Sequence, residues 1–343
     1  FTSSTSPTVA YLTATSTTAT STFAGGLSIT GIGTGLNFGS NSLFYQNNQR
    51  FLTSSTTSAG NLTIGYQSPT SIDASGGIGN TAVGYQAMQN ATSTNYNTAL
   101  GYQALKGSAT IPNVGSNTAV GFRSLYFNTT GSSNTTNGFQ SLYSNTTGSN
   151  NTANGWGSLY SNTTGGNNIA YGNSSLYSNQ SATSTTAIGQ SAARGTGNYN
   201  NQGGVYIGYQ SGYSAGNNSD YNTMVGYQSG YDLTTGANNI LLGYKAGYSG
   251  TSLTTGSNNI IIGYDIGATS TTMTRGLNIG NLLYGTNLNG SGTTLSSGNV
   301  GIGTTSPYAK LSVVGPVVAE YFHATSTTAT STYAFVKLSP IKK

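Results

Sequence analysis

Two consecutive stretches of equal length decide the fold: residues 134–150 are NTTNGFQSLYSNTTGSN, and residues 151–167 are NTANGWGSLYSNTTGGN. In both, Asn comes first, glycine stands at the fifth place, and an aromatic residue follows the glycine. A unit this short cannot bury a core of its own, so neighbouring units must stack on one another to become stable. The pair therefore predicts a solenoid, in which each stretch forms one coil.

The same glycine recurs through most of the chain, and we call it the repeat glycine. Seven of the twelve gaps between successive repeat glycines have the same length as the two stretches quoted above, and no gap is shorter. A fixed minimum with occasional insertions is typical of stacked coils with surface loops, so we expect an all-β parallel β-roll or β-solenoid of about 13 coils of about 17 residues. The repeat glycines are Gly65, Gly84, Gly101, Gly121, Gly138, Gly155, Gly172, Gly189, Gly208, Gly226, Gly243, Gly263 and Gly280.

Two further columns run through the repeats. Asn stands four residues before the repeat glycine in ten of the thirteen repeats, and an aromatic residue directly follows the glycine in ten. Stacked Asn side chains can hydrogen-bond from coil to coil, and stacked rings attract one another. The alternative is that Asn merely opens a turn. The expected structural ladder comprises Asn80, Asn97, Asn117, Asn134, Asn151, Asn168, Tyr85, Tyr102, Tyr227 and Tyr244.

The strand at the repeat glycine should have one large and one small face. Alternate strand residues point to opposite sides, which places Val83 and Tyr85 together and Ala82 with Gly84 on a narrow interior side. A second strand is expected at Ser-Leu-Tyr, which recurs at 124–126, 141–143, 158–160 and 175–177. Because a thin coil encloses only one face, the large face should pack against another copy, giving a homotrimer or filament; a monomer with that face exposed is the alternative.

Composition excludes several functions. Only 4% of the 343 residues are charged, and the ten Lys and Arg residues form no patch of the kind that binds nucleic acid. No apolar run is long enough for a membrane-spanning helix, and the absence of Cys removes disulfides and thiolate metal sites. Asn-x-Ser/Thr sequons such as Asn128, Asn145 and Asn162 are candidate glycosylation acceptors in a secreted chain.

The inventory of catalytic groups is equally sparse. The single histidine is His323, and each acidic residue lies at least twelve residues from the next. A glycosidase needs two facing carboxylates, and a calcium loop needs several acids within about a dozen residues. We therefore expect no enzymatic activity, no cofactor and no metal site. The acidic residues are Asp73, Asp220, Asp232, Asp265 and Glu320.

The chain divides into four segments by composition. Residues 1–60 form a Thr/Ser-rich linker and stalk-like β segment, 61–284 the repeat body, 285–319 a β segment like a fibre shaft, and 320–343 a Thr-rich linker. Residues 14–22 recur letter for letter at 324–332. Similar linkers on both sides of the body predict one module from a string of modules.

Residues 80–87 (NTAVGYQA) and 97–104 (NTALGYQA) resemble the head repeats of trimeric autotransporter adhesins. That resemblance implies a left-handed β-roll, three chains packed side by side, and attachment to host or matrix surfaces. Residues 298–307 (GNVGIGTTSP) and 311–315 (LSVVG) resemble the end of the shaft in phage tail fibres and related bacterial surface fibres.

The function expected from these features is that of an extracellular structural fibre or adhesin segment on a cell surface, bound to a protein receptor or glycan. A phage tail fibre on a virion tail, binding a cell-surface glycan, is the alternative. An ice-binding solenoid would need outward Thr pairs in nearly every coil, and clean pairs occur in only a few.

Overall fold

The structure is a computed structural model, and the part of the chain that it describes begins at Leu43. Side chains in residues 43–54 are not described. The Thr-rich repeats at 14–22 and 324–332, His323, Glu320 and Asp73 lie outside the described residues, as does all of the predicted linker 320–343. The described residues are 43–46, 49–54, 60–69, 77–91, 94–107, 115–197 and 199–318.

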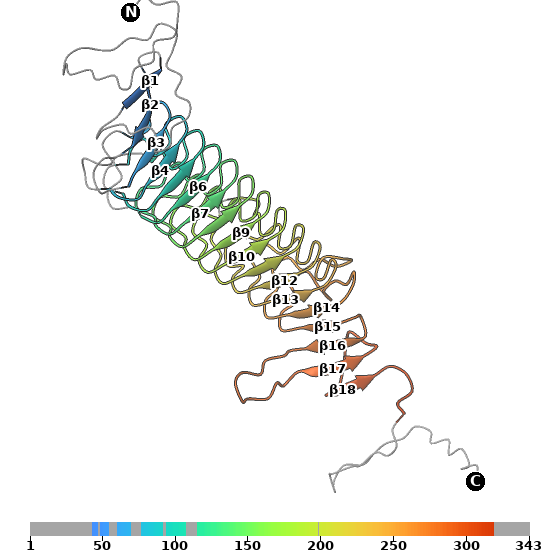
Figure 1. Cartoon of the computed structure of the whole chain (residues 1–343). Coiled ribbons are helices and arrows are strands. Elements are labelled where there is room, and N and C mark those ends of the chain that lie inside the picture. The colour runs from blue at the N-terminus through green and yellow to red at the C-terminus, as the bar shows by residue number, and fades with distance from the viewer. Residues whose placement is uncertain are drawn as a thin grey trace, which may run out of the picture. The chain divides into compact units, whose positions relative to one another are not determined.

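Thirteen strands of three residues each stack in parallel to form the body (Figure 1). Each strand pairs in register with that of the next coil, so that Ala99 lies between Ala82 and Ala119. The strands are β3 (Leu62–Ile64), β4 (Thr81–Val83), β5 (Thr98–Leu100), β6 (Thr118–Val120), β7 (Thr135–Asn137), β8 (Thr152–Asn154), β9 (Ile169–Tyr171), β10 (Thr186–Ile188), β11 (Val205–Ile207), β12 (Thr223–Val225), β13 (Ile240–Leu242), β14 (Ile260–Ile262) and β15 (Leu277–Ile279).

The predicted all-β parallel solenoid is confirmed. The thirteen strands delimit twelve complete coils. The number of coils is one fewer than the number of repeat glycines, because each glycine marks a strand and a coil runs from one strand to the next. The insertions leave the pairing intact: β5 and β6 stay in register although the gap between their glycines, Gly101 and Gly121, is one of the two longest in the repeat body. Within the described ranges no helix forms, and hence none that is long and apolar enough to cross a membrane.

Each coil has two interior positions. The middle residue of every strand from β3 to β15 is buried while its two neighbours face outward, as Ala82 does between Thr81 and Val83. We call these middle residues the strand interior column. A second buried position, the turn interior column, lies four residues after the repeat glycine, as at Leu142. Between these two columns lie buried Asn and Ser side chains, so the interior of each coil is narrow and half polar.

The small interior predicted from Ala82 holds only for part of the stack. The strand interior column changes from Ala to large residues at Tyr206, Met224, Leu241 and Ile261. The small interior face predicted at Ala82 therefore does not extend to the coils that begin at β11. The physical reason is an exchange of volume between the two columns, since the turn interior column loses its large side chains where the strand column gains them.

The repeat glycine is required by the approach of neighbouring coils. At Gly155, φ is +129°, and a Cβ would lie 2.6 Å from the carbonyl carbon and oxygen of Gly172 in the next coil. The strand ends at this corner, so Tyr85 lies beyond it and does not share a strand face with Val83. The predicted pairing of Val83 and Tyr85 on one strand face is wrong, because alternation stops where the strand stops.

The second segment of each coil forms turns instead of the predicted strand. Gln140 and Leu142 have φ values of +52° and +50°, in the left-handed region that ends an extended conformation. The segment still bonds to its neighbours: the Leu142 N–H donates to the Ser158 carbonyl at 2.8 Å, and the Gln140 N–H donates to the Phe122 carbonyl at 2.8 Å. Each coil thus has one short strand and a hydrogen-bonded series of turns.

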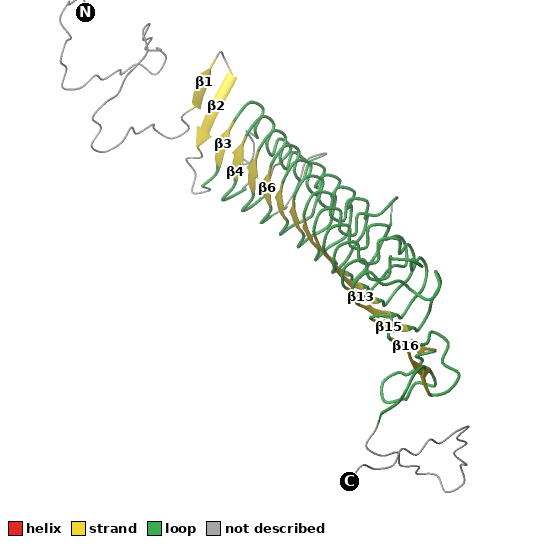
Figure 2. Ribbon diagram, turned by 90° about the vertical axis from the view of Figure 1, so that its right-hand side faces the viewer, coloured by secondary structure: helices red, strands yellow, loops and turns green. Residues whose placement is uncertain are grey.

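Strands of the opposite direction adjoin both ends of the parallel stack (Figure 2). The hairpin of β1 (Leu43–Gln46) and β2 (Gln49–Ser54) pairs antiparallel with β3 through β2. At the other end β16 (Leu283–Thr286) pairs antiparallel with β15, and β17 (Asn299–Ile302) pairs antiparallel with β16. The last strand, β18 (Leu311–Val313), runs parallel to β17. These pairings occupy the strand edges that the stack itself would leave open.

Candidate functional site

The Asn residues of the predicted ladder lie inside the coils. The Asn97 backbone N–H and side-chain Nδ2 both donate to Oδ1 of Asn80, at 3.0 and 3.2 Å. The Asn151 Nδ2 donates to Oδ1 of Asn134 at 3.1 Å and to the turn carbonyl of Gly165 at 2.9 Å. These amides therefore bond main-chain groups where the strand begins, and their burial keeps them from any external ligand. The backbone-to-Oδ1 bond recurs at Asn117, Asn134, Asn151 and Asn168.

The Asn column is interrupted at Thr185 and Gly204 and resumes at Asn222. Two buried tyrosines, Tyr199 and Tyr206, occupy the interior there. The Tyr206 hydroxyl accepts a bond from Asn201 Nδ2 at 2.9 Å and donates to the Ser219 carbonyl at 3.0 Å. Burial raises the pKa of Tyr206 to about 12 and that of Tyr199 well above its ordinary value. Both side chains are therefore neutral, and they serve as interior packing.

A second interior Asn column was not anticipated. Asn145 Nδ2 donates to Oδ1 of Asn128 at 2.8 Å, and Asn162 Nδ2 donates to Oδ1 of Asn145 at 2.9 Å. All three side chains are fully buried, so the folded protein does not expose these sequons for glycosylation. Their recurrence once per coil, each time before Thr-Thr-Gly, is the sequence signal that could have identified the column.

The aromatic residues after the repeat glycine form two exposed stacks. In the first, the rings of Tyr85 and Tyr102 are 5.0 Å apart and nearly parallel. In the second, the distance from Tyr227 to Tyr244 is 5.3 Å. Because the rings stack face on face, most of their faces are covered and mainly their edges meet solvent. We call these residues the aromatic column: Tyr66, Tyr85, Tyr102, Phe122, Phe139, Trp156, then Tyr209, Tyr227, Tyr244 and Tyr264.

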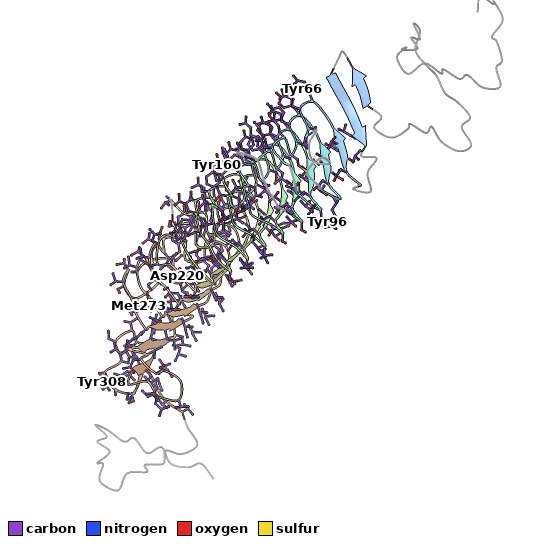
Figure 3. All side chains as sticks on the ribbon, turned by 90° about the vertical axis from the view of Figure 1, so that its left-hand side faces the viewer. Tyr66, Tyr96, Tyr160, Asp220, Met273 and Tyr308 are labelled. Carbon is purple, nitrogen blue, oxygen red and sulfur yellow. The ribbon has the colours of Figure 1, made fainter. Side chains whose placement is uncertain are left out.

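A separate series of stacked rings lies beside the aromatic column, and we call it the tyrosine column. Its first four rings are Tyr126, Tyr143, Tyr160 and Tyr177, whose successive centroids are 5.3, 5.1 and 4.9 Å apart. Figure 3 shows Tyr66 and Tyr160 on one side of the stack, with Tyr96 on the other. Burial, followed by the neighbouring tyrosines, raises the pKa of Tyr160. The Tyr of each Ser-Leu-Tyr repeat forms this column. Because the repeat was interpreted as a strand, the stacking of its Tyr rings was not predicted.

Cations continue the tyrosine column where aromatic residues are absent. Lys106 lies 5.5 Å from the ring centre of Tyr126. Arg194 lies 5.5 Å from the centre of Tyr177 and 5.6 Å from that of Tyr213, and thus joins the first four rings to the following stack of Tyr213, Tyr231 and Tyr248. A cation over a ring face replaces part of the attraction that a further ring would supply.

The outward side of the strands is a continuous surface, and we call it the sheet face. It comprises the first and third residues of β3–β15, from Leu62 and Ile64 to Leu277 and Ile279. Of these 26 residues, sixteen are Val, Ile or Leu, seven are Thr, and none is charged. Leu100 and Tyr171 are 48% and 56% exposed. Figure 2 shows the strands along one side of the body and the turns along the other.

The described residues contain no group of three His, Asp or Glu side chains that could hold a metal ion. Comparison with known proteins adds no family: no family model matches the chain, and neither a curated protein nor a solved structure gives a match. The residues and contacts above define the chain as a repetitive β-solenoid of about 12 turns.

Proposed function

We propose that this chain is a structural segment of an extracellular surface fibre, in which copies pack through the sheet face and present a rigid, repetitive surface for attachment. The role is non-enzymatic. The observation that carries the proposal is the sheet face, which continues uncharged through thirteen strands. Sixteen of its 26 residues are Val, Ile or Leu, although β7 and β8 present only Thr and Asn. An uncharged surface of this extent, rich in aliphatic side chains, is typical of an interaction site.

The dimensions of the sheet face suit self-association. Thirteen strands at about 4.8 Å make a face about 60 Å long, and three residues at about 3.3 Å make it about 10 Å wide. The projected area of about 600 Å² approaches the roughly 800 Å² that each partner contributes to a standard interface. A second copy offers the same surface of Val, Ile, Leu and Thr with two Asn and one Tyr, which needs no charged partner.

Continuous ladders support a mechanical role. Hydrogen bonds join every pair of adjacent coils from β3 to β15, and most coils add an interior amide bond or an exterior ring contact. In such a stack each coil is held mainly by its two neighbours, so bending requires many contacts to open together. A stiff rod follows, which is the property a surface fibre needs.

The resemblance of residues 80–87 and 97–104 to trimeric adhesin heads supports two further features: three chains in the assembly and a left-handed winding of the coils. The shaft-like residues 298–307 support the alternative of a phage tail fibre that binds a cell-surface glycan. Ice binding has weaker support, because Thr occupies only one of the two outward strand positions, as at Thr98 beside Leu100.

Light scattering on the purified full chain tests the assembly, and the expected mass is three times 34.9 kDa. Replacing Ile169 and Ile207 together by Lys places two charges on the sheet face without entering the coil interior. The double variant should become monomeric and keep its β circular dichroism. Thr147→Lys together with Thr164→Lys, on exposed turns, is the matched control with the same added charge and should remain assembled. A monomeric wild-type chain would overturn the proposal.

A further inference from the structure

A polar cleft of about 540 Å³ lies where the regular stack ends and β14 and β15 meet β16. Its size is within the range of about 300–1,000 Å³ that is usual for small-ligand sites. The chain departs from the repeat here, because the strand after β15 runs antiparallel and no further coil covers β15. Polar side chains line the cleft, including Ser249, Asp265, Asn278, Asn281, Tyr284 and Thr305.

Hydrogen bonds fix the polar groups of the cleft. Asn278 is buried, and its Nδ2 donates to the Gly267 carbonyl at 2.9 Å and to Oδ1 of Asn281 at 3.0 Å. The Tyr284 hydroxyl donates to the same Asn281 oxygen at 3.4 Å. The exposed Asp265 carboxylate accepts a bond from the Ser249 hydroxyl. The cleft therefore presents a carboxylate and amides that are held in place before any ligand arrives.

An exposed aromatic ring immediately precedes Asp265 in the sequence, although its side chain is not among those that line the cleft. Tyr264 directly precedes Asp265 and is the last ring of the aromatic column, stacked on Tyr244 at 4.9 Å and 75% exposed. At the next place in the column stands Asn281, which lines the cleft. Among the described residues no ring covers the second face of Tyr264, whereas Tyr227 and Tyr244 each have a ring on both sides.

The chemistry of the lining selects a ligand class. No Lys or Arg lines the cleft, so it does not suit an anion, and its single carboxylate does not suit a divalent cation, which requires several. The surface is mainly polar, which does not suit a lipid. A carboxylate, amides and hydroxyls bond to ligand hydroxyl groups, and an open aromatic face packs against C–H groups. We propose that this cleft binds a neutral oligosaccharide.

The saccharide site is formed within one chain, so a negative result for saccharide binding and a negative result for assembly through the sheet face can be distinguished. The full chain should be applied to an array of immobilised neutral glycans, including glucans, mannans, galactans and chitin oligomers, with sialylated and sulfated glycans as the acidic arm. We expect retention on at least one neutral glycan. Absence of retention on every neutral glycan, or retention on acidic glycans alone, would overturn the proposal.

Variants then locate the binding. Asp265→Asn and Tyr264→Ala should each weaken binding to the retained glycan at least tenfold by calorimetry, whereas Tyr264→Phe should keep it within about threefold because the ring remains. Asp232→Asn changes a carboxylate outside the cleft and should have no effect. Melting temperatures establish that all four variants are folded. Equal losses in Asp265→Asn and Asp232→Asn would place the site elsewhere.

Discussion

The six coils that begin at β4–β9 and the three that begin at β11–β13 fill the same cross-section in opposite ways. In the first group the strand interior column is small, five Ala and one Thr, and the turn interior column is Leu or Met. In the second group Tyr206, Met224 and Leu241 occupy the strand, and glycine occupies the turn. The comparison shows that the interior volume of a coil is maintained while the identity of each column changes.

Close contacts explain why glycine accompanies the large strand residues. A Cβ at Gly212 would lie 2.4 Å from Cδ1 of Tyr206, and one at Gly230 would lie 2.4 Å from the sulfur of Met224. These distances are shorter than any real carbon contact, so side chains at the two positions exclude each other. A large residue in the strand therefore requires a minimal residue in the turn.

The backbone at the turn position is the same in both groups. Leu142 has φ +50° and Gly230 has φ +60°, both in the left-handed region. This conformation costs an L-residue about 1–2 kcal/mol and costs glycine little. Burying a Leu side chain contributes about 1.5–3 kcal/mol, which is why the first group tolerates the strain.

The coil that begins at β10 joins the two groups. Its interior residues, Ala187 and Ala193, are both small. The segment between its repeat glycine and the next is longer than the regular repeat, and Tyr199 from this segment is buried with its hydroxyl bonded to the Ala193 carbonyl. Tyr199 therefore supplies the volume that neither column supplies.

The largest effect should come from the feature that the two groups share. Gly155→Val in the first group and Gly226→Val in the second each place a side chain against the backbone of the next coil, at a φ that L-residues rarely adopt. Overpacking and backbone strain together should lower the free energy of unfolding by about 2–6 kcal/mol in both. Urea denaturation measures the loss. A large loss at one site and none at the other would contradict a common role for the repeat glycine.

The exchange of volume can be tested by a double-mutant cycle at β13. Leu241→Ala should cost about 2–5 kcal/mol through the cavity it leaves, and Gly247→Leu should cost about 1–3 kcal/mol because its Cβ would lie 3.0 Å from Leu241. The double variant recreates the arrangement of the first group and should be more stable than the sum of the single losses by about 1–3 kcal/mol.

The matched control for this cycle combines Leu241→Ala with Gly212→Leu, which adds the same side chain two coils earlier. Tyr206 still occupies that coil, and a Cβ at Gly212 would lie 2.4 Å from its Cδ1. The control should therefore show no rescue. Equal rescue by both positions would mean that the cavity at Leu241 is filled from another coil, and that volume is not balanced coil by coil.

The sequence predicts those parts of the fold that depend on the spacing of residues, and it does not predict where each strand ends or which residues adopt left-handed conformations. The spacing of the repeat glycines indicated the correct register, because the close approach of adjacent coils admits no other residue. Strand alternation placed Ala82 inside, but the strand ends at Val83, so Tyr85 could not be placed by the same rule. The second strand failed because Leu142 and its equivalents adopt left-handed φ values that no propensity scale favours for Leu.

The candidate sites were less accessible from sequence. The sheet face depends on which strand residues are outward, and alternation indicated this. The cleft at Asp265 depends on where the stack stops and how β16 returns, which no periodic pattern contains. The sequence indicated Asn128, Asn145 and Asn162 only as sequons. In a chain rich in Asn and Thr the Asn-x-Thr pattern arises from composition alone, so it did not indicate a buried column.

Alkaline pH should weaken the second group more than the first. The pKa of buried Tyr206 is about 12, whereas the unfolded side chain titrates near its ordinary value of 10.0. Between these values the unfolded chain has lost the proton that the folded chain retains, so stability falls as pH rises from about 10 to about 12, by about 2–3 kcal/mol in total.

Tyr206→Phe removes the contribution of Tyr206, while the buried Tyr199, whose pKa is also raised, keeps its own; the readout is the difference in slope between the variant and the wild type. The substitution lowers stability at neutral pH, because Asn201 Nδ2 loses its acceptor and the Ser219 carbonyl keeps only the bond from Asn222 Nδ2. Tyr160→Phe, on the tyrosine column outside the coil, should change the slope less. Identical slopes for wild type and Tyr206→Phe would show that Tyr206 keeps its ordinary pKa.

The smallest effect concerns the junction of the two groups on the outside. Arg194 lies between the rings of Tyr177 and Tyr213 and also donates to the Tyr213 hydroxyl at 3.2 Å. Arg194→Leu should cost about 1 kcal/mol, and Arg194→Lys less, because the cation remains. Since each coil is held mainly by its neighbours, a weaker junction should let the two groups unfold separately, which broadens the urea transition before its midpoint moves far. If Lys and Leu are equally costly, the hydrogen bond to Tyr213 matters at this junction and the cation over the rings does not.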